Sequence, residues 1–373
     1  MAMSTSFGMQ APGVEDLPTP TLVVDAAVAK RNIDRLAGYV AAHGIALRPH
    51  TKTHKSQRIA QLQLAAGAVG LTVAKVGEAE SMAEVADDLL MAYPAVDPAR
   101  CHRLAQLART KTVRVAIDST IALESIAAAA GLARSTIGLL VDLDVGMGRT
   151  GVATPADALE LARRIDRTPG VRLDGILCYP GQVWEPANAQ AKPLGMIAAK
   201  LQETIDLWSK QGLQAAIVSG GSTPTAFQSH LVPPWTEIRP GTFVFNDMNT
   251  VRGGFCTLDD CAARIVCTVI SDAVPGQVVI DGGTKTFTSD VCIPARDSGH
   301  GLIVEYPQAK LTKLSEEHGQ VDVSRCDRRP KIGERISVIP NHICPCVNLQ
   351  DRFWWLEGRS LSPIIVDARG KLS

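Results

Sequence analysis

The stretch TIGLLVDLDVG (residues 136–146) is a strand-length apolar run that ends in polar residues and a glycine. Residues 28–40 are typical of the helix-length segments around such runs, with Ile33, Leu36 and Val40 on one helical face. Seven similar runs occur in the first two-thirds of the chain: ALRPH (46–50), VGLTVAKV (69–76), LLMAYPAV (89–96), TVRVAID (112–118), LDGILCY (173–179), AAIVSGG (215–221) and EIRPGTFVF (237–245). Eight strands that alternate with helices predict βαβ units, and most simply a (β/α)8 TIM barrel.

The same units could also form an open, doubly wound sheet. The hallmark of that fold is a glycine-rich dinucleotide-binding turn after the first strand, and this sequence lacks it. We therefore expect a closed barrel over residues 18–255.

The last third of the chain has a different pattern. Short strand-like runs are joined by Gly, Pro and polar turns, with few helical stretches between them. The runs are ARIVCTVIS, QVVIDGGTKTFTS, GLIVEY, QVDV, RISVIP and FWWLEG. They predict a mostly antiparallel β domain over residues 256–373, to which residues 1–17 are added.

Composition limits the possible functions. The 373 residues include 38 Lys plus Arg and 38 Asp plus Glu, so no net charge favours nucleic acid or a membrane surface. No run of about 18 apolar residues occurs, and the N-terminal sequence lacks the pattern of a signal peptide. The nine cysteines show no framework spacing, as expected for reduced thiols. We expect a cytoplasmic protein.

Several polar residues follow the predicted barrel strands, where the active sites of such barrels lie. They are Lys52, Asp144, Arg149, Tyr179 and the segment SGGSTPT (219–225). Each alone is explained by a turn or by core packing, but together they favour a site. Exposed backbone N–H groups, hydroxyls and a helix start suit a phosphate, and a lysine nearby suggests pyridoxal phosphate (PLP) held as a Schiff base.

The stretch LRPHTKTHKS (residues 47–56) contains two lysines, of which one is predicted to be reactive. Ser56 is a plausible N-cap for the helix that follows, so we expect Lys55 to be a solvated residue at the helix start. Lys52 then lies at the mouth of the barrel.

The two histidines of this stretch are His50 and His54. A metal site at this i, i+4 spacing would require a helix, and Pro49 favours a strand end instead. We expect His50 to form the wall beside Lys52.

A second cluster lies in PNHICPCVNLQD (residues 340–351). His342 and Cys344 are two residues apart, so on an extended strand both would point to one side. Imidazole and thiolate suit a divalent ion such as zinc, and two protein ligands leave positions open for water or substrate. The alternatives are an incidental His and Cys on a strand, and a further ligand in Cys346.

The chain resembles the fold-type III PLP enzymes related to D-threonine aldolase and D-serine dehydratase, whose N-terminal domain is an alanine-racemase-like barrel. Six segments in order carry the resemblance over nearly the whole chain: DLPTPTLVVD, RPHTKTHK, DVGMGRTGV, VSGGSTPT, EEHG and PNHICPCVNLQD. The resemblance also implies a homodimer in which one chain's barrel meets the other's β domain.

The resemblance implies a role for each matching residue. Lys52 would carry PLP, with Arg149 near its phenolic oxygen and Tyr179 against its ring. The phosphate would be held by Gly220, Gly221, Ser222 and Thr223, and a divalent Zn or Mn ion by His342 and Cys344. PLP would stabilise a carbanion at Cα, and the metal would polarise the substrate's β-oxygen.

Two reactions use these parts. Cleaving Cα–Cβ is the aldolase reaction, and expelling the β-hydroxyl before releasing ammonia is the dehydratase reaction. His-x-Cys favours the dehydratases, whereas VNLQD favours the aldolases. In YPGQVWEP neither subgroup's base is present, which leaves Gln182 or Glu185 as the candidate. We expect an aldolase acting on D-β-hydroxy amino acids, with the dehydratase as the alternative.

Two other functions fit less well. An amino-acid racemase needs a second acid–base group, usually a tyrosine of the β domain, and only Tyr306 lies there, outside any recognisable motif. A PLP-carrier protein would consist of the barrel alone, and this chain continues for more than 100 residues beyond it.

Overall fold

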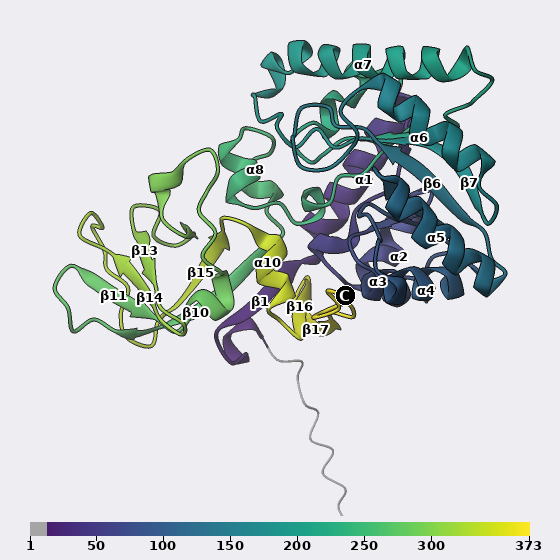
Figure 1. Ribbon diagram of the computed structural model, residues 1–373. Helices are drawn as coiled ribbons and strands as arrows, with labels where there is room; N and C mark the ends of the chain where they lie inside the picture. The colour runs from purple at the N-terminus through teal and green to yellow at the C-terminus, as the bar shows by residue number, and fades with distance from the viewer. Residues whose placement is uncertain (1–12) are drawn as a thin grey trace, which may run out of the picture.

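The computed structural model describes residues 13–373, and it shows a closed parallel barrel joined to a second sheet (Figure 1). The barrel strands are hydrogen-bonded in the order β2-β9-β8-β7-β6-β5-β4-β3, every pair being parallel. A parallel bridge between His50 and Thr72 joins the first segment to β3 and closes the ring. The strands are β2 (Ala46–Leu47), β3 (Leu71–Val73), β4 (Asp88–Met91), β5 (Thr112–Ile117), β6 (Ile137–Asp142), β7 (Val171–Leu177), β8 (Ile217–Gly220) and β9 (Glu237–Ile238). The predicted (β/α)8 barrel is thus confirmed.

Helices surround this barrel because each presents an apolar stripe to the strands. In α1, Ile33, Leu36 and Val40 are buried, as predicted, while Ala37 is half-buried. Inside the barrel a separate cluster of Leu90, Ala116, Leu140 and Leu177 fills the centre. The helices around the barrel are α1 (Ala26–Ala42), α2 (Gln57–Ala65), α3 (Val76–Met82), α4 (Pro98–Leu107), α5 (Thr120–Ala133), α6 (Pro155–Arg167) and α7 (Ala191–Ser209), followed by the short α8 (Met248–Arg252).

The second sheet contains nine strands, antiparallel except where β1 pairs with β16. Its strands are β1 (Thr21–Asp25), β10 (Ala263–Ser271), β11 (Gln277–Ile280), β12 (Gly301–Ile303), β13 (Lys310–Leu314), β14 (Gly319–Asp322), β15 (Arg335–Pro340), β16 (Arg352–Glu357) and β17 (Ser360–Ile365). The predicted mostly antiparallel domain is confirmed. β1 falls inside the range predicted for the barrel, yet it lies between β10 and β16.

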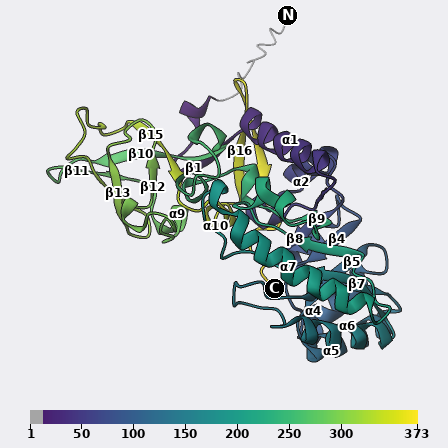
Figure 2. The same cartoon turned by 90° about the horizontal axis from the view of Figure 1, so that it is seen from above.

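Two short helices interrupt segments that the sequence pattern predicted to be strands. QVVIDGGTKTFTS is a strand only as far as Ile280, and α9 (Thr284–Phe287) follows. α10 (Ile343–Asn348) begins just after β15, in the second cluster of the sequence. Seen from above, α10 and β1 lie between the barrel and the far end of the second sheet (Figure 2).

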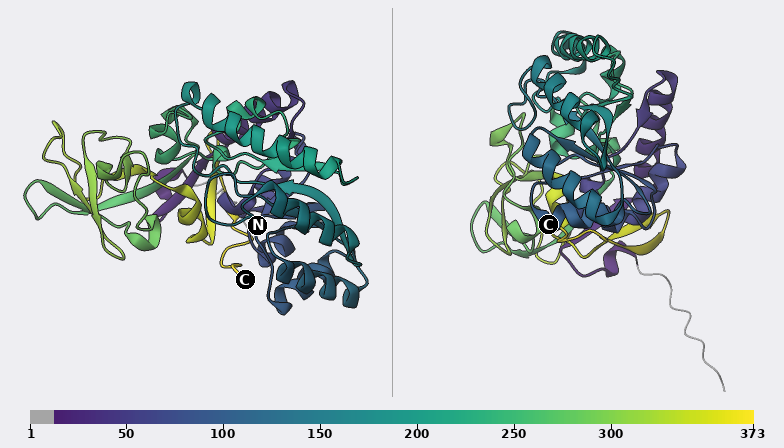
Figure 3. Two further views of the ribbon diagram at one scale, coloured as in Figure 1. Left: turned by 45° about the horizontal axis from the view of Figure 1, so that its top comes forward. Right: turned by 45° about the vertical axis from the view of Figure 1, so that its right-hand side comes forward.

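The hairpin β16–β17 lies at the junction of the two parts (Figure 3). Beyond it, residues that follow β17 pack onto the barrel, where Ala368 N donates to Lys55 O at 3.0 Å. Among residues 13–373, none of the helices has the length and apolar character needed to cross a bilayer.

Candidate active site

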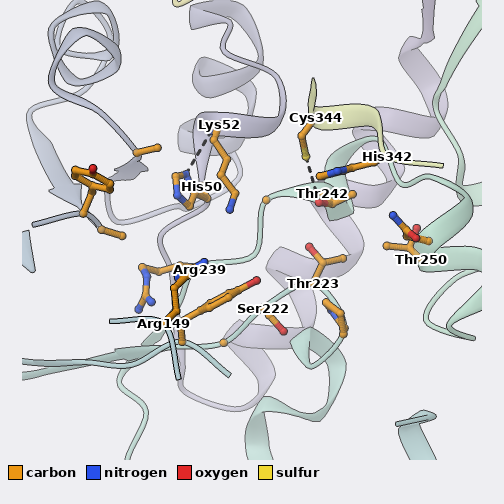
Figure 4. Close-up of a pocket in the computed structure, with 18 of the residues that line it drawn as sticks. His50, Lys52, Arg149, Ser222, Thr223, Arg239, Thr242, Thr250, His342 and Cys344 are labelled. Carbon is orange, nitrogen blue, oxygen red and sulfur yellow. Dashed lines mark hydrogen bonds between the residues drawn. The ribbon is translucent and has the colours of Figure 1, made fainter. Parts of the chain in front are cut away.

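A cavity of about 530 Å³ lies at the carboxyl ends of the barrel strands, where α10 of the second part faces them (Figure 4). It brings together most of the residues singled out in the sequence. Those lining it are His50, Lys52, Arg149, Tyr179, Gly221, Ser222, Thr223, His342 and Cys344. Gly220 and Gln182 do not line it.

Lys52 lies on a single 3-10 turn, Thr51–Thr53, that follows the first barrel segment. The buried Thr51 hydroxyl is 2.9 Å from Glu78 Oε1 and 3.1 Å from the Thr72 carbonyl oxygen, which fixes the turn against β3 and α3. The Lys52 side chain is exposed to the cavity, unlike its buried neighbours. The turn thus presents one amine to the cavity.

His50 is buried beside this lysine, and its Nδ1 accepts from Lys52 N at 3.4 Å. Burial lowers the pKa of His50 well below its ordinary value, and the positive charges of Lys52 and Arg239 lower it further. The imidazole is therefore neutral at physiological pH.

Lys55 is buried, so the expectation of a solvated lysine is wrong. Its Nζ donates to Ala368 O at 3.4 Å, and burial lowers the pKa of Lys55 although Glu78 opposes this. The sequence pattern failed here because the covering residue lies 313 positions along the chain.

Ser56 is the N-cap of α2, as predicted, but its hydroxyl makes no capping bond. The Asp367 carboxylate instead accepts from Gln57 N at 2.8 Å. His54 is buried, accepts from Ser56 N at 3.1 Å and pairs with Gln63, so it supports the start of α2 and does not reach the cavity.

The loop after β8, where the sequence predicts a phosphate to bind, turns at Gly221. Gly221 has φ +75°, and a Cβ there would lie 2.8 Å from Ile238 Cβ, so a side chain is excluded by backbone and space. Ser222 and Thr223 line the cavity next to it (Figure 4). Gly220 serves packing instead, since a Cβ would lie 2.1 Å from Trp235 Nε1.

Arg149 lies over the Tyr179 ring, with its guanidinium carbon 4.7 Å from the ring centroid. The two residues come from the loop after β6 and the end of β7 and form one wall of the cavity. Asp144 lies outside the cavity lining, where its carboxylate accepts from the N–H groups of Gly146 and Gly148 and shapes the loop.

Three charged lining residues were missed from the sequence, namely Asp142, Arg239 and Asp247. Arg239 is buried and donates to Ser219 Oγ at 2.7 Å and to the Cys178 carbonyl at 2.8 Å. Burial raises the pKa of Asp142 to about 6, although the Thr150 hydroxyl donates to it at 2.8 Å. Asp142 is the last residue of β6 and Arg239 directly follows β9, so a position at a strand end was the available signal for both.

His342 and Cys344 are together, but not on an extended strand. His342 is the N-cap of α10 and Cys344 lies in its first turn, so the prediction of a strand is wrong. The Cys344 thiol donates to Thr53 Oγ1 at 3.2 Å, and the His342 and Cys344 side chains both line the cavity. Burial opposes both charges, but the attraction between the two side chains outweighs it: the pKa of His342 is raised to about 10, with help from Asp247 and Asp290, and the pKa of Cys344 is lowered.

The pair has the chemistry of a catalytic metal site. Asp290 Oδ2 lies 2.7 Å from His342 Nδ1, which leaves Nε2 as the free ring nitrogen, and a carboxylate behind a histidine is the usual support of a metal ligand. Cys346 is buried and bonds to backbone carbonyls. Across residues 13–373, no group of three or more His, Cys, Asp or Glu side chains is placed to hold a metal. Two protein ligands with open positions therefore fit a catalytic ion better than a structural one.

Gln182 does not line the cavity, so the geometry gives no support to its predicted catalytic role, which stays a prediction. Its side-chain amide donates to the Val145 carbonyl oxygen at 2.7 Å and so links the loop after β7 to the loop after β6. Glu185, the other candidate base, is exposed and accepts from Trp184 N. Trp184 lines the cavity in their place.

Two family models match the chain in sequence. The alanine racemase N-terminal domain matches residues 24–248, and the putative serine dehydratase domain matches residues 262–356. D-threonine aldolase of Arthrobacter sp. is 31% identical over 340 residues, 89% of this chain and 87% of that protein. D-threo-3-hydroxyaspartate dehydratase of Delftia sp. (strain HT23) is 33% identical over 353 residues, 88% and 91% of the two chains.

Solved structures agree with these matches. The crystal structure of D-threonine aldolase from Filomicrobium marinum superposes with a TM-score of 0.91 at 27% identity, covering 97% of this chain and 99% of the other. Structures of D-threo-3-hydroxyaspartate dehydratase include a histidine-to-alanine mutant and a cysteine-to-alanine mutant in a metal-free form. The two changed residues lie two positions apart, as His342 and Cys344 do. The chain belongs to the fold-type III family of PLP-dependent lyases that includes D-threonine aldolase and D-serine dehydratase.

Proposed function

We propose that this protein is a PLP- and divalent-metal-dependent lyase that cleaves D-β-hydroxy amino acids to glycine and an aldehyde. One observation carries the proposal: Lys52 and the pair His342–Cys344 face one cavity from different parts of the chain (Figure 4). An amine for the cofactor and a metal for the substrate's β-oxygen are what a retro-aldol cleavage of these substrates requires.

The cavity residues would divide the work by position. Lys52 would hold the cofactor aldehyde, and Gly221, Ser222 and Thr223 its phosphate. Arg149 and Tyr179 would hold the ring from one side. PLP, once bound, supplies the electron sink that a carbanion at Cα needs.

His50 and Arg239 would set the charge around the cofactor. The neutral His50 accepts from the Lys52 backbone N–H, so it fixes the turn without adding a charge. Arg239 donates to Ser219, whose own hydroxyl donates to Glu237, and it would therefore present a fixed cation to the cavity. The proton acceptor would be a group that lines the cavity, because Gln182 does not line it.

His342 and Cys344 would bind Zn or Mn. Asp290 would hold the imidazole so that Nε2 faces the ion. A bound ion would polarise the β-hydroxyl of the substrate, whose proton must leave as Cα–Cβ breaks.

Dehydration to a 2-oxo acid and ammonia is the second candidate. The His-x-Cys spacing favours it, because D-threo-3-hydroxyaspartate dehydratase has a histidine and a cysteine at the same separation. Racemisation has less support: the Tyr306 hydroxyl donates to Glu334, and this tyrosine does not line the cavity.

Product analysis with D-threonine separates the two lyase reactions. We expect glycine and acetaldehyde in equal amounts from the PLP- and metal-loaded protein. Formation of 2-oxobutanoate and ammonia would refute the aldolase assignment in favour of dehydration, and D-to-L conversion would show a racemase.

The oligomeric state and the cellular location that we propose are those that the family resemblance and the composition of the sequence imply. We propose a homodimer in the cytoplasm, in which residues 18–255 form the PLP-binding unit and residues 256–373 with 1–17 the metal-bearing unit. Light scattering of the purified protein tests the dimer, for which a monomer mass is the contrary result.

A further inference from the structure

The turn that carries Lys52 also contacts the second part of the chain. Thr53, the next residue of this 3-10 turn, is fully buried. Its hydroxyl oxygen accepts from the Cys344 thiol at 3.2 Å, although Cys344 lies on α10, 291 positions further along the chain. Thr53 therefore joins the predicted cofactor lysine to a predicted metal ligand.

The turn has little freedom to move apart from this contact. On one side, the Thr51 hydroxyl is held by Glu78 at 2.9 Å. On the other, the loop after β9 packs directly on the turn, because a Cβ at Gly241 would lie 2.9 Å from Thr53 Oγ1 and 3.0 Å from the His50 carbonyl oxygen. A displacement of Thr53 is therefore passed to Lys52, its neighbour on the same turn.

The Thr53 hydroxyl can keep its contact when a metal binds to Cys344. A coordinated cysteine is a thiolate, which can only accept hydrogen bonds, whereas a hydroxyl both donates and accepts. Among residues 13–373 the Thr53 hydroxyl donates to no other group, so its proton can turn to the sulfur. A hydrogen bond to an ionised acceptor is roughly twice as strong as a neutral one, so metal binding would strengthen the contact between α10 and the turn.

We propose that Thr53 is a positioning residue that couples the two cofactor sites, so that PLP and the metal each bind more tightly when the other is present. A metal on Cys344 would fix the Thr53 hydroxyl and with it the turn of Lys52, and PLP on Lys52 would fix the turn and with it the hydroxyl. The two effects must be equal, because coupling between binding sites is reciprocal. The inference rests on the proposed function, which assigns PLP to Lys52 and the metal to Cys344.

A second threonine provides a matched control. The Thr242 hydroxyl lies 3.6 Å from the same Cys344 sulfur, but it belongs to the loop after β9 and not to the turn of Lys52 (Figure 4). Thr242→Val therefore removes a hydroxyl beside the metal ligand and leaves the connection to Lys52 in place. Thr53→Val and Thr53→Ala both remove the connecting hydroxyl, of which the first nearly keeps the side-chain shape, and Thr53→Ser retains the hydroxyl.

Equilibrium dialysis of PLP against zinc-loaded and chelator-treated protein measures the coupling. In wild type we expect zinc to raise PLP affinity at least about fivefold, the lower end of typical coupling between two sites. The factor should fall below about twofold in Thr53→Val and Thr53→Ala and stay at about fivefold or more in Thr53→Ser and Thr242→Val. Competition with a chromophoric zinc chelator, with and without PLP, should return the same factor for each variant.

The contrary results are distinct from a failure of the proposed function. A protein that binds PLP and zinc independently, or keeps the wild-type factor in Thr53→Val and Thr53→Ala, would leave the lyase standing and overturn the coupling. An equal loss of the factor in Thr242→Val would also overturn it, because the path through the turn of Lys52 would then be wrong. If PLP produces no visible absorbance or zinc does not bind, the proposed function is refuted and the inference falls with it.

Discussion

Replacing Asp290 by alanine should weaken metal binding without removing a metal ligand. The Asp290 carboxylate lies 2.7 Å from His342 Nδ1 and would therefore fix which ring nitrogen faces a bound ion. Loss of such a supporting group typically costs about 10- to 100-fold in metal affinity, or about 1.4 to 2.7 kcal/mol. The two side chains are 39% and 45% exposed, so solvent screens the pair, and we expect the lower value of about tenfold.

Competition with a chromophoric zinc chelator at fixed pH measures this affinity directly. Asp290→Asn retains an acceptor for the Nδ1–H group and should fall between wild type and Asp290→Ala. Asp297→Ala, an exposed acid on the same loop, is the control for a general change of charge. If Asp290→Ala binds zinc as tightly as Asp297→Ala does, Asp290 does not support a metal ligand.

Three further experiments test other parts of the site. Lys52→Ala should abolish the visible absorbance of bound PLP while Lys55→Ala retains it, since only Lys52 lines the cavity; the opposite pattern would move the cofactor to Lys55. Burial lowers the pKa of His54 to about 4 in the folded chain. Between about pH 6.5 and pH 4 the unfolded chain therefore binds a proton at this histidine that the folded chain does not bind, so the free energy of unfolding decreases as the pH is lowered through this range. Urea unfolding of wild type should show about 2 kcal/mol more loss between pH 7 and pH 5 than His54→Gln; equal losses would contradict this. Gly221→Ala should lower PLP affinity in equilibrium dialysis at least about tenfold, because φ +75° and Ile238 both exclude a Cβ there, and unchanged affinity would place the phosphate elsewhere.

Local patterns predicted the barrel and the turn of Lys52 well. A buried parallel strand is a continuous apolar run, so the runs that end at Asp142 and Gly220 could be recognised from their own residues. The residues that directly follow these runs lie at the carboxyl ends of the barrel strands. Lys52 and Arg149, which were predicted from this position, do line the cavity. Their catalytic roles stay predictions.

Features set by distant residues could not be predicted in this way. Lys55 is buried by Ala368, and α2 is capped by Asp367, both from the far end of the chain. The strand predicted through His342 is a helix start because Pro340 ends β15 and the Asp247 carboxylate accepts from Ile343 N. Asp247 lies 96 residues away, beyond the reach of any periodicity.

The position of β1 in the second sheet affects the order in which the chain can fold during its synthesis. β1 is synthesised first, yet its neighbours β10 and β16 begin only at Ala263 and Arg352. All eight barrel strands are synthesised after β1 and before β10, so the barrel can be complete while the apolar TLVVD segment of β1 is still unpaired. β1 also continues directly into α1 at Ala26, which keeps it beside the new barrel. The growing chain therefore carries one apolar strand without its partners until β10 and β16 have been made.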